Sequence, residues 1–318
     1  MESVELGGPG GLGVSRLAFG GCPMGGHGWG EVFRGDLVRA INAALDSGLN
    51  FFDTADTYGL GEGERTIGQA LRGRRHEAVI ATKFGVRVEP GRTVYDNSRA
   101  WIRQALDASL QRLDTDYIDL YQIHYRDDVT PLEEVVDALA ELRQQGKVRN
   151  FGLSNVGISD ANELSVHGAG FVAVQDEFSL ANRTNEHDLT MLAGEFPLTP
   201  MTWGSLGQGI LSGKYDASST FGPDDRRSRP IYVNFHGEKL AQNLRIVDRL
   251  RDIADEVGRS VPAVAIRWIL DHVPGSVAIV GIKNERQLAA NLEALGWSLD
   301  ADAVAALDEV SSAWEVVA

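Results

Sequence analysis

The feature that most constrains the fold is a regular alternation of strand-like and helix-like segments, which begins near residue 36 and continues to about residue 295. In residues 36–48, for example, apolar side chains recur at the spacing of one helical face, and Gly48 ends the segment. Helices are predicted at residues 36–48, 62–72, 98–113, 131–146, 189–196, 238–257, 263–270 and 286–295. Strands are predicted at residues 50–55, 78–84, 117–124, 148–153, 172–178, 201–203 and 276–282.

Strands that alternate with helices of about 10–15 residues form βαβ units, whose strands are parallel. Counted from Leu17, about eight strands are each followed by a crossover, and eight such units close into a barrel. The sequence therefore predicts an α/β protein with a (β/α)8 TIM barrel, extra C-terminal helices and one domain over residues 1–318. Ser98 is expected to cap the helix that follows it. Residues 216–236 form the longest irregular stretch, as expected of a lid or binding loop.

Residues 8–13 match the G-x-G-x-x-G pattern of dinucleotide-binding loops. That loop requires a buried strand before it and a helix after it. Here only Val4-Glu5-Leu6 precedes the glycines, and the strand-like residues 14–19 follow them. The sequence therefore favours a glycine-rich turn over a Rossmann domain, within a small N-terminal β-hairpin that plugs the barrel.

The charge and cysteine content limit the partners and the compartment. A formal net charge of −15 argues against nonspecific binding to nucleic acid or to an anionic membrane. Cys22 is the single cysteine, so no internal disulfide forms, which fits a reducing compartment. The sequence shows no signal-peptide or transmembrane segment, so the cytoplasm is the expected location. It also lacks the Cys/His spacing of a metal site, and no metal is expected.

Four chemically active side chains stand at or just after the ends of consecutive predicted strands. Asp53 and Tyr58 follow one strand, Lys83 ends the next, and His124 ends the one after that. Because the carboxyl ends of barrel strands converge on one face, these side chains are expected to face one another. Taken singly, each also has a structural interpretation as a turn, core or strand-end residue.

The four residue types suit the reduction of a carbonyl, which needs a hydride and a proton. A tyrosine is protonated at neutral pH and can donate, while a nearby Lys83 ammonium is expected to lower the pKa of Tyr58 toward the working range. Asp53 would hold and balance that lysine. His124 would donate a hydrogen bond to the carbonyl oxygen and orient it.

These motifs resemble the aldo-keto reductase family over nearly the whole chain. Phe52-Asp53-Thr54-Ala55 with Tyr58, then Thr82-Lys83 and Gln122-Ile123-His124, is similar to the family's catalytic tetrad. The resemblance implies a nicotinamide cofactor, usually NADPH, extended across the barrel mouth, and a small carbonyl or alcohol as substrate. It also implies that Ser154, Asn155 and Gln175 bind the nicotinamide carboxamide and that Trp203 stacks under the ring, although Trp203 alone could be a core residue.

Two further segments resemble the family's phosphate and adenosine sites. Residues 203–215 are similar to its pyrophosphate loop, although Gly204-Ser205 stands where Ser-Pro is usual, which puts the contact at Gly204 in doubt. Lys283, near the start of a helix, could pair with a 2′-phosphate and so favours NADP over NAD, but Gln287 occupies the place of a familiar arginine and use of NAD stays open. The predicted cofactor contacts are Cys22, Asp53, Ser154, Asn155, Gln175, Trp203, Gly204, Ser205, Leu206, Gly207, Gln208, Lys214, Arg227, Gly281, Lys283, Gln287 and Asn291.

Some of these assignments have alternatives. Cys22 could be a small buried thiol, and Lys283 an ordinary surface lysine. The basic cluster Arg226, Arg227 and Arg229 could close over the cofactor phosphates or form a solvated charge run.

The substrate is less constrained than the reaction. The predicted substrate contacts are Trp29, Tyr58, Tyr95 and His124, and Arg126 could reach a hydroxyl or an acidic group or lie at the surface. A sugar or polyol-type carbonyl is favoured, with the direction of the reaction and the oligomeric state open.

Two other functions compete with catalysis. The segment from Met201 to Tyr215 also resembles the potassium-channel β-subunits of the superfamily, so the alternative is a redox-sensing regulatory subunit with little turnover. The presence of His124 favours an enzyme over such a subunit. An isomerase acting on phosphorylated sugars would not need Trp203 or the Ser154-Asn155 pair.

Overall fold

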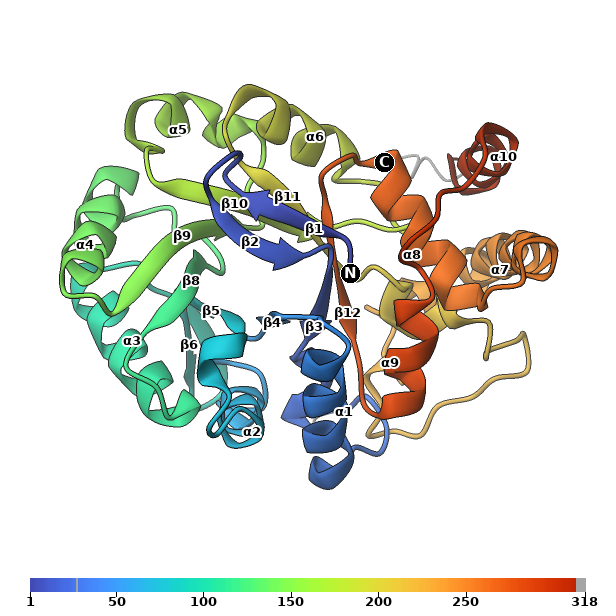
Figure 1. The fold of residues 1–318 in the computed structure, drawn as a ribbon, viewed down its shortest axis with the longest axis horizontal. Coiled ribbons are helices and arrows are strands. Elements are labelled where there is room, and N and C mark those ends of the chain that lie inside the picture. The colour runs from blue at the N-terminus through green and yellow to red at the C-terminus, as the bar shows by residue number, and fades with distance from the viewer. Residues whose placement is uncertain (27, 313–318) are drawn as a thin grey trace.

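The computed structural model describes residues 1–26 and 28–312 and contains a closed barrel of parallel strands (Figure 1). Neighbouring strands pair in the order β10-β11-β12-β3-β4-β5-β8-β9, and β9 closes the ring on β10. The strands are β3 (Leu17–Gly20), β4 (Phe51–Asp53), β5 (Val79–Phe84), β8 (Ile118–Ile123), β9 (Val148–Ser154), β10 (Phe171–Glu177), β11 (Thr199–Trp203) and β12 (Val277–Gly281). The predicted (β/α)8 barrel is confirmed.

Helices surround the barrel, as the ring of coiled ribbons in Figure 1 shows. Ser98 caps α3 as predicted, because its side chain accepts a hydrogen bond from the Trp101 amide at 3.3 Å. The helices are α1 (Arg34–Asp46), α2 (Glu62–Ala70), α3 (Arg99–Leu113), α4 (Leu132–Gln144), α5 (Ala161–His167), α6 (Glu186–Glu195), α7 (Gly237–Val257), α8 (Val261–His272), α9 (Glu285–Leu292) and α10 (Ala301–Ser312). The extra C-terminal helices that the sequence predicted are present: α8 is the additional helix predicted at residues 263–270, whereas no helix was predicted at α10.

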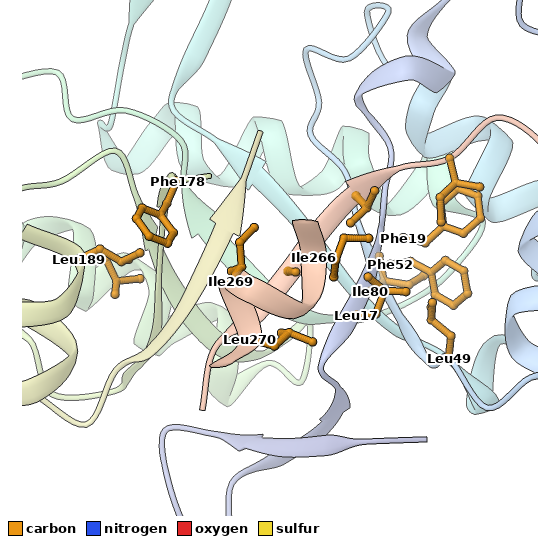
Figure 2. Packing of buried hydrophobic residues seen from close by; sticks show 14 of the residues in the cluster. Leu17, Phe19, Leu49, Phe52, Ile80, Phe178, Leu189, Ile266, Ile269 and Leu270 are labelled. Atoms are coloured by element: carbon orange, nitrogen blue, oxygen red, sulfur yellow. The ribbon is translucent and has the colours of Figure 1, made fainter. Parts of the chain in front are cut away.

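Side chains alternate between two cores along each barrel strand. Leu17 and Phe19 of β3 pack outward against the helices, together with Phe52, Leu49 and Ile80, as Figure 2 shows. The residues between them point inward and fill the barrel. The inner cluster comprises Leu6, Val14, Ala18, Phe51, Val79, Ala81, Leu120, Ala173, Met201, Val277 and Ile279. This alternation decides which side chains reach the barrel mouth.

The N-terminal hairpin closes the bottom of the barrel. β1 (Ser3–Leu6) pairs antiparallel with β2 (Leu12–Ser15), and Leu6 and Val14 join the inner cluster. The backbone amide of Gly7 donates to the Thr199 hydroxyl at 3.0 Å, at the start of β11. The glycine-rich residues 8–13 therefore belong to a hairpin turn, and the dinucleotide-loop alternative is excluded by the strand that follows them.

The mouth carries structure that the sequence pattern did not predict. A second hairpin, β6 (Val86–Glu89) with β7 (Arg92–Tyr95), follows β5 directly. Residues 216–236 are irregular as predicted, apart from short turns at Arg226–Ser228 and Val233–Phe235. Across the described part of the chain, none of the helices combines the length and the apolar character needed to cross a membrane.

Candidate active site

The strand alternation that places Phe51 and Ala81 inside the barrel also aims the polar residues after them into its mouth. Asp53 lies two residues after Phe51, and Lys83 two residues after Ala81. The Lys83 ammonium lies 2.7 Å and 3.0 Å from the two carboxylate oxygens of Asp53. It also donates to the Thr54 carbonyl at 2.9 Å. The predicted Asp53–Lys83 pair therefore forms at the centre of the mouth.

Asp53 is held by amides as well as by the lysine. Gln122 and Gln175, from β8 and β10, donate to its Oδ2 at 3.2 Å and 3.0 Å. Lys83 is 1% exposed and Asp53 2% exposed, so the two charges are buried and must satisfy one another. Donors from three other strands of the barrel, β5, β8 and β10, therefore fix this carboxylate.

Tyr58 reaches the mouth from the loop between β4 and α2. The Lys83 Nζ atom lies 5.2 Å from the centroid of its ring. Burial raises the pKa of Tyr58 well above its usual value of 10, and the neighbouring Cys22 and Asp53 raise it further. The expectation that Lys83 lowers the pKa of this phenol is therefore wrong for the protein alone, since Asp53 already compensates the ammonium. Tyr58 is a protonated phenol.

His124 stands beside Tyr58, with the two rings edge to face and 6.0 Å apart. Its Nδ1 atom is buried and has no hydrogen-bond partner among the described residues. Burial, with the charge of Lys83 as a smaller cause, lowers the pKa of His124 from 6.5 to about 3. The imidazole is therefore neutral across the physiological range, and it carries one N–H and one acceptor nitrogen.

A second set of polar and aromatic side chains lies at the ends of β9, β10 and β11. The Asn155 side-chain amide donates to the His124 carbonyl at 2.9 Å and to the Ser154 hydroxyl at 3.1 Å. The Trp203 indole N–H in turn donates to the Asn155 side-chain oxygen at 3.3 Å. The structure thus brings Ser154, Asn155, Gln175 and Trp203 together beside the tetrad, as the resemblance implied.

A large cavity, with a volume of about 1570 Å³, runs from this group to the start of α9. Among the predicted residues, Lys83, Gly207 and Tyr95 do not line it: Lys83 lies beneath Asp53, and Gly207 is buried against Ala181. The predicted residues that do line it are Cys22, Trp29, Asp53, Tyr58, His124, Ser154, Asn155, Gln175, Trp203, Gly204, Ser205, Leu206, Gln208, Lys214, Arg227, Gly281, Lys283, Gln287 and Asn291.

Gly204, which stands where a serine is usual, adopts a φ of +67°, in the left-handed region that residues with a side chain rarely adopt. A Cβ atom there would lie 3.1 Å from Cγ of Glu177. The glycine at position 204 therefore has a local cause, and both Gly204 and Ser205 still line the cavity.

The far end of the cavity is positively charged. Lys214, Arg227 and Lys283 line it, and Arg286, which the sequence reasoning did not single out, joins them from α9. Burial, together with the positive charges of Lys214 and Arg227, lowers the pKa of Lys283 to about 8. Such crowding of like charges fits a site for an anion, whose binding would relieve it.

Of the basic cluster, Arg227 is 7% exposed and forms an ion pair with Asp225, whereas Arg229 is exposed and lies outside the cavity wall. The prediction that the cluster closes over the cavity therefore holds for Arg226 and Arg227 but not for Arg229. The path of the 216–236 loop places Arg226 and Arg227 in the cavity wall and Arg229 outside it.

A second, smaller pocket lies around Tyr58. A small pocket of about 200 Å³ is lined by Cys22, Gly25, Trp29, Thr57, Tyr58, Gly59 and Arg226. Cys22 is half-buried, and burial raises the pKa of its thiol, so it is neutral. The sequence placed the 216–236 loop at the barrel mouth but assigned Arg226 itself to the phosphates, and nothing in its local pattern indicates that it lies beside Tyr58.

Two other predicted wall residues lie further out. Tyr95 is 50% exposed and stacks on Tyr125, which itself stacks on His124 at a centroid distance of 5.0 Å. Tyr125 therefore lines the cavity, whereas Tyr95, predicted to contact the substrate, lies behind it. Arg126 is held by Glu163 at 3.0 Å, so the interpretation in which it contacts substrate is not supported.

Comparison with known proteins places this geometry in a family. The model of the aldo/keto reductase family matches residues 16–312. The chain is 34% identical to the aldo-keto reductase YhdN of Bacillus subtilis, over 92% of this chain and 88% of that protein. It is 33% identical to a probable voltage-gated potassium channel subunit beta of Oryza sativa subsp. japonica, over 90% of this chain and 88% of that protein.

Solved structures give the same result. The glycerol dehydrogenase AKR11B4 of Gluconobacter oxydans is 34% identical, with a TM-score of 0.86 over 97% of this chain and 94% of that chain. An aldo-keto reductase of Klebsiella pneumoniae in complex with NADPH is 28% identical, with a TM-score of 0.76 over 98% and 95% of the two chains. The chain therefore belongs to the aldo/keto reductase family, and the prediction of an oxidoreductase of this family is confirmed.

Proposed function

We propose that the protein transfers a hydride reversibly between NADPH and a small aldehyde or ketone, with Tyr58 as the general acid and base. The observation that carries this proposal is the meeting of Tyr58, His124 and the Asp53–Lys83 pair at one wall of a cavity whose other end is cationic. When bound, the reduced nicotinamide would supply the hydride. The remaining chemistry belongs to the side chains of the chain itself.

Tyr58 gives its phenolic proton to the carbonyl oxygen in reduction and takes it back in oxidation. Its raised pKa keeps that proton in place until charge develops on the oxygen. The neutral His124 imidazole donates its single N–H to the same oxygen and so fixes the direction of the carbonyl. Lys83 supplies positive potential 5.2 Å from the phenol ring, which stabilises the tyrosinate as it forms.

The cavity residues fit the cofactor in three parts. Trp203 offers a flat face at the tetrad end, beside the amide and hydroxyl groups of Ser154, Asn155 and Gln175. Lys214, Arg227 and Lys283 would hold the phosphates, and Gln287 and Asn291 the adenosine end. The excess positive charge around Lys283 and Arg286 supports NADP over NAD, because a 2′-phosphate adds an anion that NAD lacks.

For the substrate, we propose a sugar or polyol-type carbonyl or the corresponding alcohol. The similarity to a glycerol dehydrogenase structure supports this class. The 200 Å³ pocket beside Tyr58, with few apolar walls besides Trp29, suits a small polar molecule.

A direct test measures oxidation of NADPH, and of NADH in parallel, by the purified protein over a panel of aldehydes, ketones and aldoses. The proposal predicts turnover with at least one member of the panel and a higher kcat/KM with NADPH than with NADH. Tight binding of NADPH without any turnover would contradict the proposal and favour the regulatory alternative, for which the similarity to a channel β-subunit is the support. Absence of binding by either dinucleotide would contradict both.

A further inference from the structure

Arg226 occupies an unusual position for a basic side chain. It lines the 200 Å³ pocket together with Tyr58 and Trp29, and among the described residues of that wall it is the one with a formal positive charge. Its neighbour Arg227 forms an ion pair with Asp225, but Arg226 forms none with any carboxylate in residues 1–26 and 28–312. A guanidinium group that faces the reacting centre and has no carboxylate partner can bind an anionic group of a ligand.

The position of Arg226 is fixed by the loop on the opposite side of the pocket. Its backbone amide donates to the Gly28 carbonyl at 2.8 Å. Gly28 has a φ of +71°, and a Cβ atom there would lie 2.5 Å from Cγ of Arg226, so only a glycine leaves room for the arginine stem. The two loops thus meet at this contact and hold the side chain over the pocket.

The guanidinium group itself retains most of its hydrogen-bonding capacity. Its centre lies 5.8 Å from the Trp29 ring, and Nη1 makes one long hydrogen bond, of 3.4 Å, to the Tyr232 hydroxyl. An arginine has five N–H donors arranged as a planar fork, which matches the two oxygens of a carboxylate. The remaining donors are therefore available for a bidentate contact.

We infer that Arg226 is a specificity-determining residue that binds a carboxylate on the carbonyl substrate, so that the preferred substrates within the proposed sugar and polyol class are those that carry a carboxylate, the polyhydroxylated oxo acids. This inference rests on the proposed carbonyl reduction and names the class of substrate more narrowly. The pocket holds Tyr58 and Arg226 in one wall, so the reacting carbonyl and the carboxylate of a small molecule reach both at once. Because the protein as a whole is strongly acidic, a local cation is what admits an anionic substrate to this mouth.

The test compares two aldehydes of nearly equal shape, 4-carboxybenzaldehyde and 4-formylbenzamide, which differ in the charge of the para group. We expect Arg226→Gln to raise KM for the carboxylate about 10–100-fold, the loss of one charge-assisted contact, with a much smaller change for the amide. Arg229→Gln, which removes the same charge from the same loop outside the cavity, should leave both substrates unchanged. Arg226→Lys should recover part of the preference, because it restores the charge without the fork.

Calorimetry separates this inference from the reduction itself. The alcohol 4-(hydroxymethyl)benzoate should bind the wild type more tightly than its amide analogue, and Arg226→Gln should abolish that difference. If no aldehyde is reduced but the difference is seen, the inference stands and the proposed reaction fails. Equal weakening of the acid and the amide would overturn the inference. So would a higher Kd for NADPH in Arg226→Gln with substrate selectivity unchanged, because Arg226 would then serve the cofactor phosphates.

Discussion

At the scale of single residues, the site depends on charges that are buried but compensated. Lys83 and Asp53 are almost inaccessible to water, and each satisfies the other at 2.7 Å. Removing one partner of such a pair leaves the other charge unpaired, which costs about 3–5 kcal/mol. The pair is therefore neutral as a whole, with its ammonium 5.2 Å from the Tyr58 ring, and Tyr58 and His124 are neutral as well.

The neutral state of His124 has a consequence for the pH profile. Its pKa of about 3 lies far below the ordinary 6.5, and the pKa of Tyr58 is raised well above 10. Neither group of the free protein then changes its charge between about pH 5 and pH 9, so neither should add a limb in that range to the pH profile of kcat/KM for the carbonyl substrate, measured at saturating NADPH. A limb near pH 6.5 that disappears in His124→Asn would show that the histidine titrates and would contradict this account.

The positions of Arg226 and Arg286 in the cavity wall were not predicted from the sequence. The tetrad could be predicted because each member ends or follows a strand, and parallel strands converge at one face. The position of Arg226 beside Tyr58 depends on how an irregular loop of about twenty residues crosses the mouth, and no local pattern encodes that path. Arg286 was overlooked because Gln287, the next residue, matched the family motif.

At the scale of secondary-structure elements, the buried strands could be predicted from the sequence, whereas the more exposed elements could not. The barrel strands were found because both faces are apolar, as for β3 and β5, whose residues are all buried. The hairpin of β6 and β7 was not predicted. Three of the four residues of β7 are exposed, so the strand shows no alternation of apolar and polar residues in the sequence. Similarly, α5 buries Leu164 alone, too little for a helical face to appear in the sequence.

The C-terminal helix α10 is attached to the barrel by a polar network. Arg183 lies 2.7 Å from Glu186 and 3.1 Å from Asp308 of α10, and His272 contacts the same two carboxylates at 2.6 Å and 3.3 Å. Burial alone would raise the pKa of Glu186, but hydrogen bonds from His272 and Arg183 outweigh it and lower the pKa from 4.5 to about 2. The network therefore stabilises the folded protein above pH 4.5 and loses that contribution as the pH falls toward 2.

We predict that Arg183→Met lowers the free energy of unfolding by about 1–3 kcal/mol at neutral pH, since it removes a partly buried ion pair. The difference from the wild type should shrink between pH 4.5 and about 2, because Glu186 becomes protonated in both proteins. Thermal unfolding across this range measures it. Arg72→Met, at an arginine whose side chain is 71% exposed, is the matched control and should change little. A difference that is independent of pH would contradict the role given to Glu186.

At the scale of the whole molecule, the two ends of the barrel have different roles. The carboxyl end carries the cavity and the tetrad, and the amino end is closed by the N-terminal hairpin. Glu2 connects that hairpin to the rest of the chain: it accepts a hydrogen bond from the Gly296 amide at 2.7 Å and pairs with Arg267 at 3.1 Å and Arg16 at 3.4 Å. These contacts join segments from both ends of the sequence.

Glu2→Ala should therefore lower the free energy of unfolding by about 1–3 kcal/mol, because it removes a partner of the buried Arg267 and leaves the Gly296 amide without its acceptor. Denaturant unfolding measures the loss. Because Glu2 lies at the opposite end of the barrel, KM for NADPH and kcat should stay at wild-type values. A changed KM in a fully folded variant would show that the two ends are coupled.

The central claim is that Tyr58 protonates the carbonyl oxygen within a cavity that binds NADPH, and Tyr58→Phe tests it most directly. This variant removes the proton donor and keeps the ring that packs beside His124 and Lys83. We predict that NADPH binds to the variant with nearly unchanged affinity, measured by fluorescence titration, while kcat for reduction falls by about 100-fold or more. A variant that binds NADPH and keeps a wild-type kcat would contradict the claim, because the proton would then come from another group.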